Sequence, residues 1–265
     1  MITAVIDAKE ERDVAVVDIP NAFVQTEMDD EVLMIMRGRL AELMGTVSPE
    51  IYNKYITIEN GKKVLYVKLL NALYGTLKAA LLFYQKLVGD LESQGFELNP
   101  YDLCVANKII NGKQMTLTWH VDDMKISHVS PDEVTKMIEF LKSKYANDGI
   151  GVMKVSRGKV HEYLGMTLDY TEKGIVKINM IDYVKRMIEN FPEEVTSASS
   201  PASEYLFKVD EAAENLKEDS KQQFHTSVAK GLFVCKRDRP DIQTSIAFLS
   251  TRVKSPDTDD WKKLK

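Results

Sequence analysis

Two adjacent acidic residues, Asp122 and Asp123, lie between two runs of alternating apolar residues, and this stretch constrains the fold more than any other. Residues 115–119 lead into it and residues 124–127 lead out of it. Alternation on both sides of a short polar break predicts a β-hairpin with the acids at or beside its turn. Repulsion makes it costly to ionise two neighbouring carboxylates, and a divalent metal ion removes that cost. Taken alone, the doublet is equally typical of a solvated turn.

A third acid, Asp18, ends a buried strand that we predict over residues 13–19, where most residues are β-branched. Pro20 cannot continue a ladder, so a turn and a short helix should follow. Asp18 then either caps this turn or faces the acid doublet from a neighbouring strand. In the second case three carboxylates converge, and such a set can hold two Mg²⁺ ions about 3.5–4 Å apart for in-line phosphoryl transfer.

Composition places the chain among ordinary globular proteins. Its 265 residues are 44% hydrophobic and 28% charged, which allows one large domain or two small ones. No apolar run approaches the ~20 residues that span a bilayer. The two cysteines, Cys104 and Cys235, are isolated, which fits buried core positions in a reducing, intracellular setting. The net charge of −5 argues against general attraction to a phosphate backbone, although a groove can be locally basic.

The first two thirds of the chain alternate between strands and helices. Asn60-Gly61 and Asn111-Gly112 each predict a hairpin turn, and a third hairpin is expected at 163–169 and 175–179. Helices are expected at 38–47, 76–94, 131–146 and 180–190. We expect the second of these to bury Leu77, Leu81, Tyr84, Leu87 and Leu91 and to end at Gly95. For the third, Ser130 and Glu133 predict a capping box, and Asn147-Asp148-Gly149 should end it.

Composition changes at residues 193–203, where Ser, Ala, Glu and Pro dominate and predict a linker. Helices are expected beyond it at 221–234 and 240–253, and Ser255-Pro256-Asp257 should cap one more. The fold class is therefore α+β with a helical C-terminal segment.

Several motifs in one order resemble the reverse transcriptase of copia-type LTR retrotransposon polyproteins. Residues 17–23, Val-Asp-Ile-Pro-Asn-Ala-Phe, are similar to the motif that carries the first catalytic aspartate. Leu73-Tyr74-Gly75 with the following helix is similar to the motif that packs against template and nucleotide. Residues 120–123 are similar to the aromatic-x-Asp-Asp box, and residues 163–166 to the primer-grip hairpin. Residues 239–242, 255–256 and 261 resemble the region that leads towards RNase H.

The resemblance implies a polymerase palm-like antiparallel sheet with flanking helices. Residues 1–192 would form the palm with partial fingers, 193–203 a linker, and 204–265 a helical thumb/connection segment truncated before RNase H. The family has a long segment before its first aspartate that forms much of the fingers, and here Asp18 lies near the start.

Site residues follow from the same resemblance. Asp18, Asp122 and Asp123 would be catalytic and would hold the metal ions, together with the backbone carbonyl of Ile19. Nucleotide contacts would come from Phe23, as a steric gate against a ribose 2′-hydroxyl, and from Tyr74 and Gly75. The primer grip would be Tyr163, Leu164, Gly165 and Met166. A lysine near Lys154 or Lys159 would protonate the leaving pyrophosphate.

The implied cofactor is a pair of Mg²⁺ ions, with Mn²⁺ as the alternative. The implied partners are an RNA template, a DNA primer or hybrid duplex, deoxynucleoside triphosphates, and the integrase and RNase H regions of a parent polyprotein; no membrane is implied. The implied location is intracellular and cytoplasmic, in a virus-like particle, with the nucleus as the alternative.

Three departures from the family leave a second interpretation open, and the first is the short segment before Asp18. His120 stands where the family has tyrosine, and its aromatic ring would take the same place. Residues 77–82, Leu-Lys-Ala-Ala-Leu-Leu, stand where the family has Gln, Ser or Ala, Pro and Arg, which contact the nucleotide. The alternative is a catalytically inactive, truncated retroelement remnant that at most binds nucleic acid.

Overall fold

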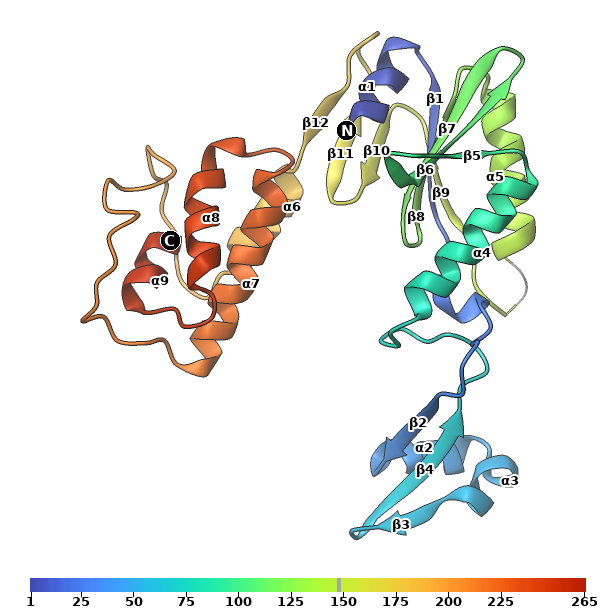
Figure 1. The fold of residues 1–265 in the computed structure, drawn as a ribbon, viewed down its shortest axis with the longest axis horizontal. Helices are drawn as coiled ribbons and strands as arrows, with labels where there is room; N and C mark the ends of the chain where they lie inside the picture. The colour runs from blue at the N-terminus through green and yellow to red at the C-terminus, as the bar shows by residue number, and fades with distance from the viewer. Residues whose placement is uncertain (147–148) are drawn as a thin grey trace. The chain divides into compact units, whose positions relative to one another are not determined.

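The computed structural model describes residues 1–146 and 149–265 and has the predicted mixture of helices and antiparallel sheets (Figure 1). It forms two compact units, which are described separately. The first contains Met1–His161 with Lys173–Ile175, and the second contains Glu162–Glu172 with Val176–Lys265.

A six-stranded antiparallel sheet forms the centre of the first unit. Its order is β5-β6-β7-β8-β1-β9, so the first strand of the chain pairs on both edges with strands that come more than a hundred residues later. The predicted strands at 13–19, 104–110 and on both sides of the acid doublet are confirmed. The strands are β5 Glu97–Asn99, β6 Asp102–Ile110, β7 Lys113–His120, β8 Asp123–His128, β1 Asp13–Asp18 and β9 Lys154–Arg157.

Helices α4 (Ala79–Ser93) and α5 (Pro131–Tyr145) cover one face of this sheet. Side chains that alternate along the strands, such as Val17, Leu117 and Ile126, form a buried core with residues of both helices. The two helices are also joined by a hydrogen bond that Tyr145 Oη donates to Asp90 Oδ2 at 2.6 Å. Burial and the Asp90 carboxylate both raise the pKa of Tyr145, so its hydroxyl stays protonated as the donor.

Helix α1 (Ile2–Lys9), which the sequence patterns did not predict, packs against the sheet through a buried ionic cluster. Asp7 forms an ion pair with Lys125 of β8 and lies 3.8 Å from Arg12 Nη1; all three side chains are at least 96% buried. Arg12 also donates hydrogen bonds to Thr116 at 3.0 Å and Ser127 at 3.3 Å. Burial lowers the pKa of Lys125 and Asp7 opposes that effect. The cluster pairs the buried charges on this face of the sheet, although Asp7 Oδ1 accepts no hydrogen bond from the described residues.

A smaller three-stranded sheet lies between β1 and α4 in the chain. Its order is β2-β4-β3, with β2 Leu33–Arg37, β4 Lys62–Lys68 and β3 Thr57–Glu59. The Asn60-Gly61 turn has φ values of 48° and 72°, as a two-residue hairpin with positive φ at both positions requires. Helices α2 (Arg39–Val47) and α3 (Pro49–Tyr52) follow β2.

The second unit combines a small sheet with helices. The strands are β10 Val160–Tyr163, β11 Met166–Asp169 and β12 Lys177–Asn179, and the helices are α6 Ile181–Glu189, α7 Glu218–Cys235, α8 Gln243–Arg252 and α9 Thr258–Leu264. Phe224, Val228 and Cys235 of α7 pack with Ile246 and Leu249 of α8 to form the core of the helices. The predicted helices at 180–190, 221–234 and 240–253 are confirmed within a few residues.

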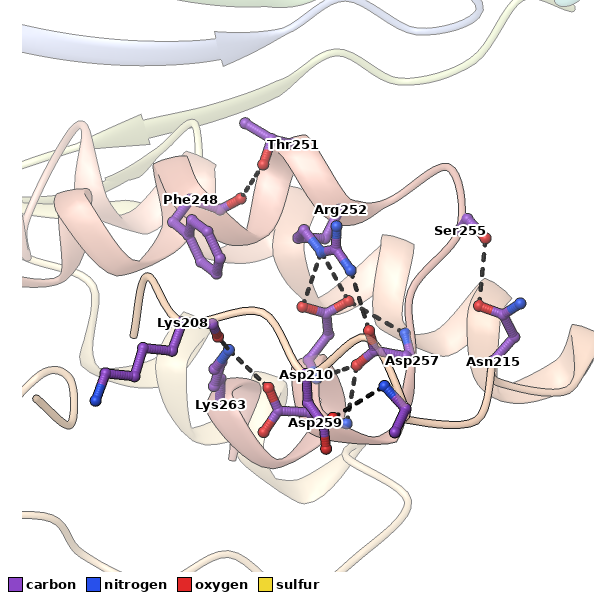
Figure 2. Close-up of polar contacts among 12 residues, drawn as sticks. Lys208, Asp210, Asn215, Phe248, Thr251, Arg252, Ser255, Asp257, Asp259 and Lys263 are labelled. Carbon is purple, nitrogen blue, oxygen red and sulfur yellow. Dashed lines mark hydrogen bonds and ion pairs between the residues drawn. The ribbon is translucent and has the colours of Figure 1, made fainter. Parts of the chain in front are cut away.

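The start of α9 is held by a charged cap, as the sequence predicted for this position (Figure 2). The Asp257 side chain accepts hydrogen bonds from the backbone N–H groups of Asp259 at 2.9 Å and Asp260 at 2.8 Å. Asp260 in turn accepts from the Asp257 N–H at 3.1 Å, and Arg252 at the end of α8 donates to both carboxylates at 3.0 Å. The ion pairs therefore tie the end of α8 to the beginning of α9.

Two local predictions were wrong. Ser130 is the N-cap residue of α5, but its side chain makes no capping hydrogen bond, and Glu133 instead accepts from Lys136 at 2.6 Å. Leu77 and Leu81 are exposed, because α4 begins only at Ala79 and turns Leu82 and Phe83 towards the core. Asn147 and Asp148, predicted with Gly149 to end α5, lie outside the described residues.

Candidate active site

The acid doublet lies at the tip of the β7–β8 hairpin, as predicted. His120 pairs with Asp123, which leaves Val121 and Asp122 as a two-residue turn. Val121 has a φ of 59°, a conformation that a β-branched residue rarely adopts. Strain of this kind costs about 1–3 kcal/mol and persists only where surrounding structure fixes it. Here Val121 packs against the core of the first unit, and this contact fixes the turn that carries Asp122.

Asp18 faces the doublet from the neighbouring strand. In the β1–β8 register Asp18 pairs directly with Asp123, and the Ile19 N–H donates a hydrogen bond to the Asp122 carbonyl at 3.0 Å. On the other edge of β1, Asp18 pairs with Lys154 of β9, whose Nζ lies 3.6 Å from Asp18 Oδ2. The structure thus brings together the three predicted aspartates, Ile19 and one of the two candidate lysines. Lys159 lies in the β9–β10 turn.

The charges of these acids act on their neighbours. Burial, then Asp122 and Asp18, raise the pKa of Asp123 above the usual aspartate value, while His120 opposes the shift. Burial, then Asp122 and Asp18, also raise the pKa of Tyr74. Burial is the larger cause of both shifts, and a cation bound here would relieve the smaller part that comes from repulsion between the acids.

Carboxylate oxygens are the donors that Mg²⁺ and Mn²⁺ prefer, so the chemistry of the acid set fits these ions. Within the described residues, no three side chains of Asp, Glu, His or Cys are grouped closely enough to hold a metal ion. The strand register makes Asp18 and Asp123 adjacent, but the described side chains as they stand do not form a metal site.

Phe23 and Tyr74 form an aromatic pair close to the acids. Phe23 lies in a short 3₁₀ helix, Ala22–Gln25, and is 91% buried, with its ring centroid 4.5 Å from that of Tyr74 and 6.3 Å from that of Phe83. Tyr74 is half-exposed. Gly75 has a φ of 96°, which favours glycine, and the space where a Cβ would lie is open. The predicted nucleotide-contacting residues are therefore neighbours of the acids.

The sequence patterns missed the ion pairs between Lys78 and a second acidic doublet, Asp29 and Asp30. Lys78 Nζ lies 3.3 Å from Asp29 Oδ2 and also forms an ion pair with Asp30. Asp29 and Asp30 lie outside any strand–turn–strand pattern, and no signal in the sequence connects them to residue 78. Lys78 follows Tyr74 and Gly75 and immediately precedes α4, so these exposed ion pairs link residues 29 and 30 to the start of that helix.

The predicted primer-grip residues, Tyr163 to Met166, belong to the second unit and are described with it. Leu164 and Gly165 form the two-residue turn between β10 and β11, with φ values of 50° and 73°. Tyr163 and Met166, on either side of the turn, are buried.

Comparison with known proteins identifies the family. A family model described as reverse transcriptase (RNA-dependent DNA polymerase) matches residues 1–203. The chain belongs to this family. It is also 22% identical over 256 residues to the retrovirus-related Pol polyprotein from transposon TNT 1-94 of Nicotiana tabacum, covering 94% of this chain and 17% of that polyprotein. The expected resemblance to a copia-type reverse transcriptase is thereby confirmed.

Solved structures of a telomerase give weaker matches. The apo telomerase of Candida tropicalis aligns with 95% of this chain and 44% of its own, at 10% sequence identity and a TM-score of 0.40. A form of that telomerase truncated from its C-terminal domain covers 67% of this chain and 38% of its own, at 9% identity and a TM-score of 0.35. In the described part of the reverse transcriptase chain, no helix has the length and apolar character of a membrane span.

Proposed function

We propose that this chain is the core of an RNA-directed DNA polymerase of a retrotransposon, which transfers nucleotides onto a primer 3′-hydroxyl. The observation that carries the proposal is the register of β1 and β8, which pairs Asp18 with Asp123 beside the strained turn holding Asp122. Family membership supports the reaction class. The chain spans 17% of the tobacco polyprotein's length. Activities of a whole polyprotein are therefore proposed for this chain and are not shown.

Asp18, Asp122 and Asp123 would hold the metal ions, with the Ile19 carbonyl as a further oxygen ligand. When bound, two Mg²⁺ or Mn²⁺ ions lower the pKa of the attacking hydroxyl and neutralise charge on the leaving pyrophosphate. The backbone supplies the preorganisation, since the Ile19 N–H holds the Asp122 peptide to the end of β1. Lys154, whose Nζ lies 3.6 Å from Asp18 Oδ2, would donate a proton to the pyrophosphate.

Phe23 would select the sugar of the incoming nucleotide. Its ring is confined by Tyr74 and Phe83 and cannot move aside without losing both aromatic contacts. A rigid ring at this position would leave no room for a ribose 2′-hydroxyl. Gly75 would let the backbone approach the nucleotide closely.

The remaining parts would serve the nucleic acid. In this proposal the six-stranded sheet is the palm, the β2-β4-β3 sheet forms partial fingers, and Tyr163 to Met166 contact the primer end. In functional terms the chain divides into 1–192, a linker at 193–203, and a thumb/connection segment at 204–265. The substrates are an RNA template, a DNA primer or hybrid duplex, and deoxynucleoside triphosphates. Integrase and RNase H regions would be neighbours in a parent polyprotein. The polyprotein would be located in the cytoplasm, in virus-like particles, or in the nucleus.

Primer extension on an RNA template with Mg²⁺ and deoxynucleotides tests the proposal. Asp122→Asn combined with Asp123→Asn should abolish incorporation. The matched control is Asp29→Asn with Asp30→Asn, which removes the same charge from an exposed doublet and should retain activity. If the purified, folded chain incorporates nothing, it is instead the inactive remnant, and the proposed activity is wrong.

The gate has its own test. Phe23→Ala should increase ribonucleotide incorporation relative to deoxynucleotide incorporation. Phe96→Ala, which removes another buried ring of the same core, serves as the control for loss of packing. Unchanged sugar selection in Phe23→Ala would remove Phe23 from this role.

A further inference from the structure

An aromatic and cationic stack lies against the Leu164–Gly165 turn in the second unit. The rings of Tyr183 in α6 and Phe233 in α7 have centroids 5.1 Å apart. The Arg237 guanidinium carbon lies 3.7 Å from the centroid of the Phe233 ring, and Arg237 Nη1 donates a hydrogen bond to the Phe233 carbonyl at 3.1 Å. Phe233 is therefore held from its ring and from its backbone.

The two rings contact the turn at Gly165. A Cβ atom built on Gly165 would lie 3.4 Å from Phe233 Cε1 and 3.4 Å from Tyr183 Cδ2. This spacing means that the rings cover the backbone of the turn directly, without an intervening side chain.

Leu164, the other residue of the turn, has a φ of 50°. Residues other than glycine rarely adopt this conformation, and the two-residue hairpin between β10 and β11 requires it here. The rings of Tyr183 and Phe233 pack on this turn at Gly165, so they are in a position to restrict the motion of a turn whose shape the hairpin sets.

Phe233 is not part of the core that joins α7 to α8. The core between α7 and α8 is formed by Phe224, Val228, Cys235, Ile246 and Leu249. Phe233 is half-buried and lies outside that core among the described residues. Its contacts run to α6, to Arg237 and to the turn.

We propose that Phe233, together with Tyr183, is a positioning residue that fixes the Leu164–Gly165 turn and thereby the nucleic-acid end that the turn contacts. The link to nucleic acid rests on the proposed polymerase function. The holding of the turn does not, because it follows from contacts within the second unit alone.

The test compares Phe233→Leu with Phe248→Leu in the full chain. Phe248 is also half-buried and also packs against a ring, that of Phe207 at 5.5 Å, so its loss controls for general destabilisation. Phe233→Tyr keeps the ring and should behave like the wild type. Hydrogen exchange is measured in the peptide covering residues 162–167, and affinity is measured with a labelled DNA primer annealed to RNA.

Phe233→Leu should speed exchange in that peptide about tenfold and weaken primer–template affinity about tenfold, the effect of losing an aromatic pair. The KM for deoxynucleotide should change by less than about twofold, because the substitution leaves the nucleotide-binding site intact. Phe248→Leu should leave both the exchange and the primer affinity within about twofold of wild type.

Unchanged exchange in Phe233→Leu overturns the proposal, whether or not the chain extends primers. Faster exchange with unaltered primer affinity overturns the link to nucleic acid. Faster exchange in a chain whose wild type fails to extend or bind primers supports the positioning of the turn while refuting the polymerase function.

Discussion

Replacing Asp123 by asparagine should stabilise the metal-free protein while removing activity. The pKa of Asp123 is raised by burial and by the charges of Asp122 and Asp18, so its ionised form is unfavourable in the folded chain. Asparagine keeps the size of the side chain and removes the charge. The same substitution should therefore raise the free energy of unfolding when no divalent ion is present.

The β1–β8 register allows the magnitude to be worked out. Side chains directly opposite on paired strands lie about 5 Å apart. Two unit charges at about 5 Å repel by about 0.8 kcal/mol in water and by about 3 kcal/mol at an effective dielectric constant of about 20. Asp123 is only half-buried and salt screens it, so we expect a gain of about 1 kcal/mol.

Urea unfolding followed by tryptophan fluorescence provides the assay. Trp119 lies in the core of the first unit and Trp261 in the second, stacked on Phe191. A Trp261→Phe background therefore reports the unit that contains the acids. Excess Mg²⁺ should stabilise the wild type more than Asp123→Asn, because binding to the folded state adds to its stability.

The sign can also be checked with pH. A raised carboxyl pKa means that the folded state holds its proton more tightly than the unfolded chain. The wild type therefore loses stability relative to Asp123→Asn as the pH rises from the ordinary aspartate value of about 3.9 through the higher value in the fold. A variant that is less stable than wild type above that range, or a difference that does not grow with pH, would refute the reasoning.

Three further substitutions test the packing of the two units by urea unfolding. Lys125→Met leaves Asp7 buried without its closest partner and should cost about 3–5 kcal/mol, and adding Asp7→Leu should restore much of the loss. Tyr145→Phe removes the hydrogen bond to the carboxylate on α4 and should cost about 1.5 kcal/mol. Gly231→Ala puts a Cβ 2.6 Å from Ile246 Cδ1 between α7 and α8 and should cost about 1–3 kcal/mol. If one of these variants were as stable as the wild type, that result would contradict the contact described for it.

Local sequence patterns located most elements because they depend on residues close in the chain. Asn60-Gly61 and the alternating runs around Asp122 and Asp123 specify hairpins by themselves, and both are confirmed. Gly95 ends α4 with a φ of 79°, as its position predicted. The acid doublet could therefore be placed at a turn without knowledge of the fold.

Pairing over long sequence distances could not be obtained in this way. Nothing in residues 13–18 specifies β8 as a partner, and the meeting of Asp18 with Asp123 was expected only conditionally or by family resemblance. Strand β9, Lys154–Arg157, is short and mostly polar, and it forms because β1 offers a free edge. Because this strand was not predicted, the sequence could not distinguish Lys154 from Lys159 as the lysine that would protonate the pyrophosphate. Helix α1 was missed because its determinant is Lys125, more than a hundred residues away.

The insertion of β1 between β8 and β9 also orders events during synthesis. Until β8 has been made, β1 has neither of its partners, and until β9 follows, one of its hydrogen-bonding edges remains available to other chains. The acids that define the site are thus kept apart until β8 (Asp123–His128) has been made. A ribosome-bound precursor that ends before β8 would carry Asp18 without the assembled acid site, and one that ends before β9 would leave one edge of β1 open to pairing with other chains.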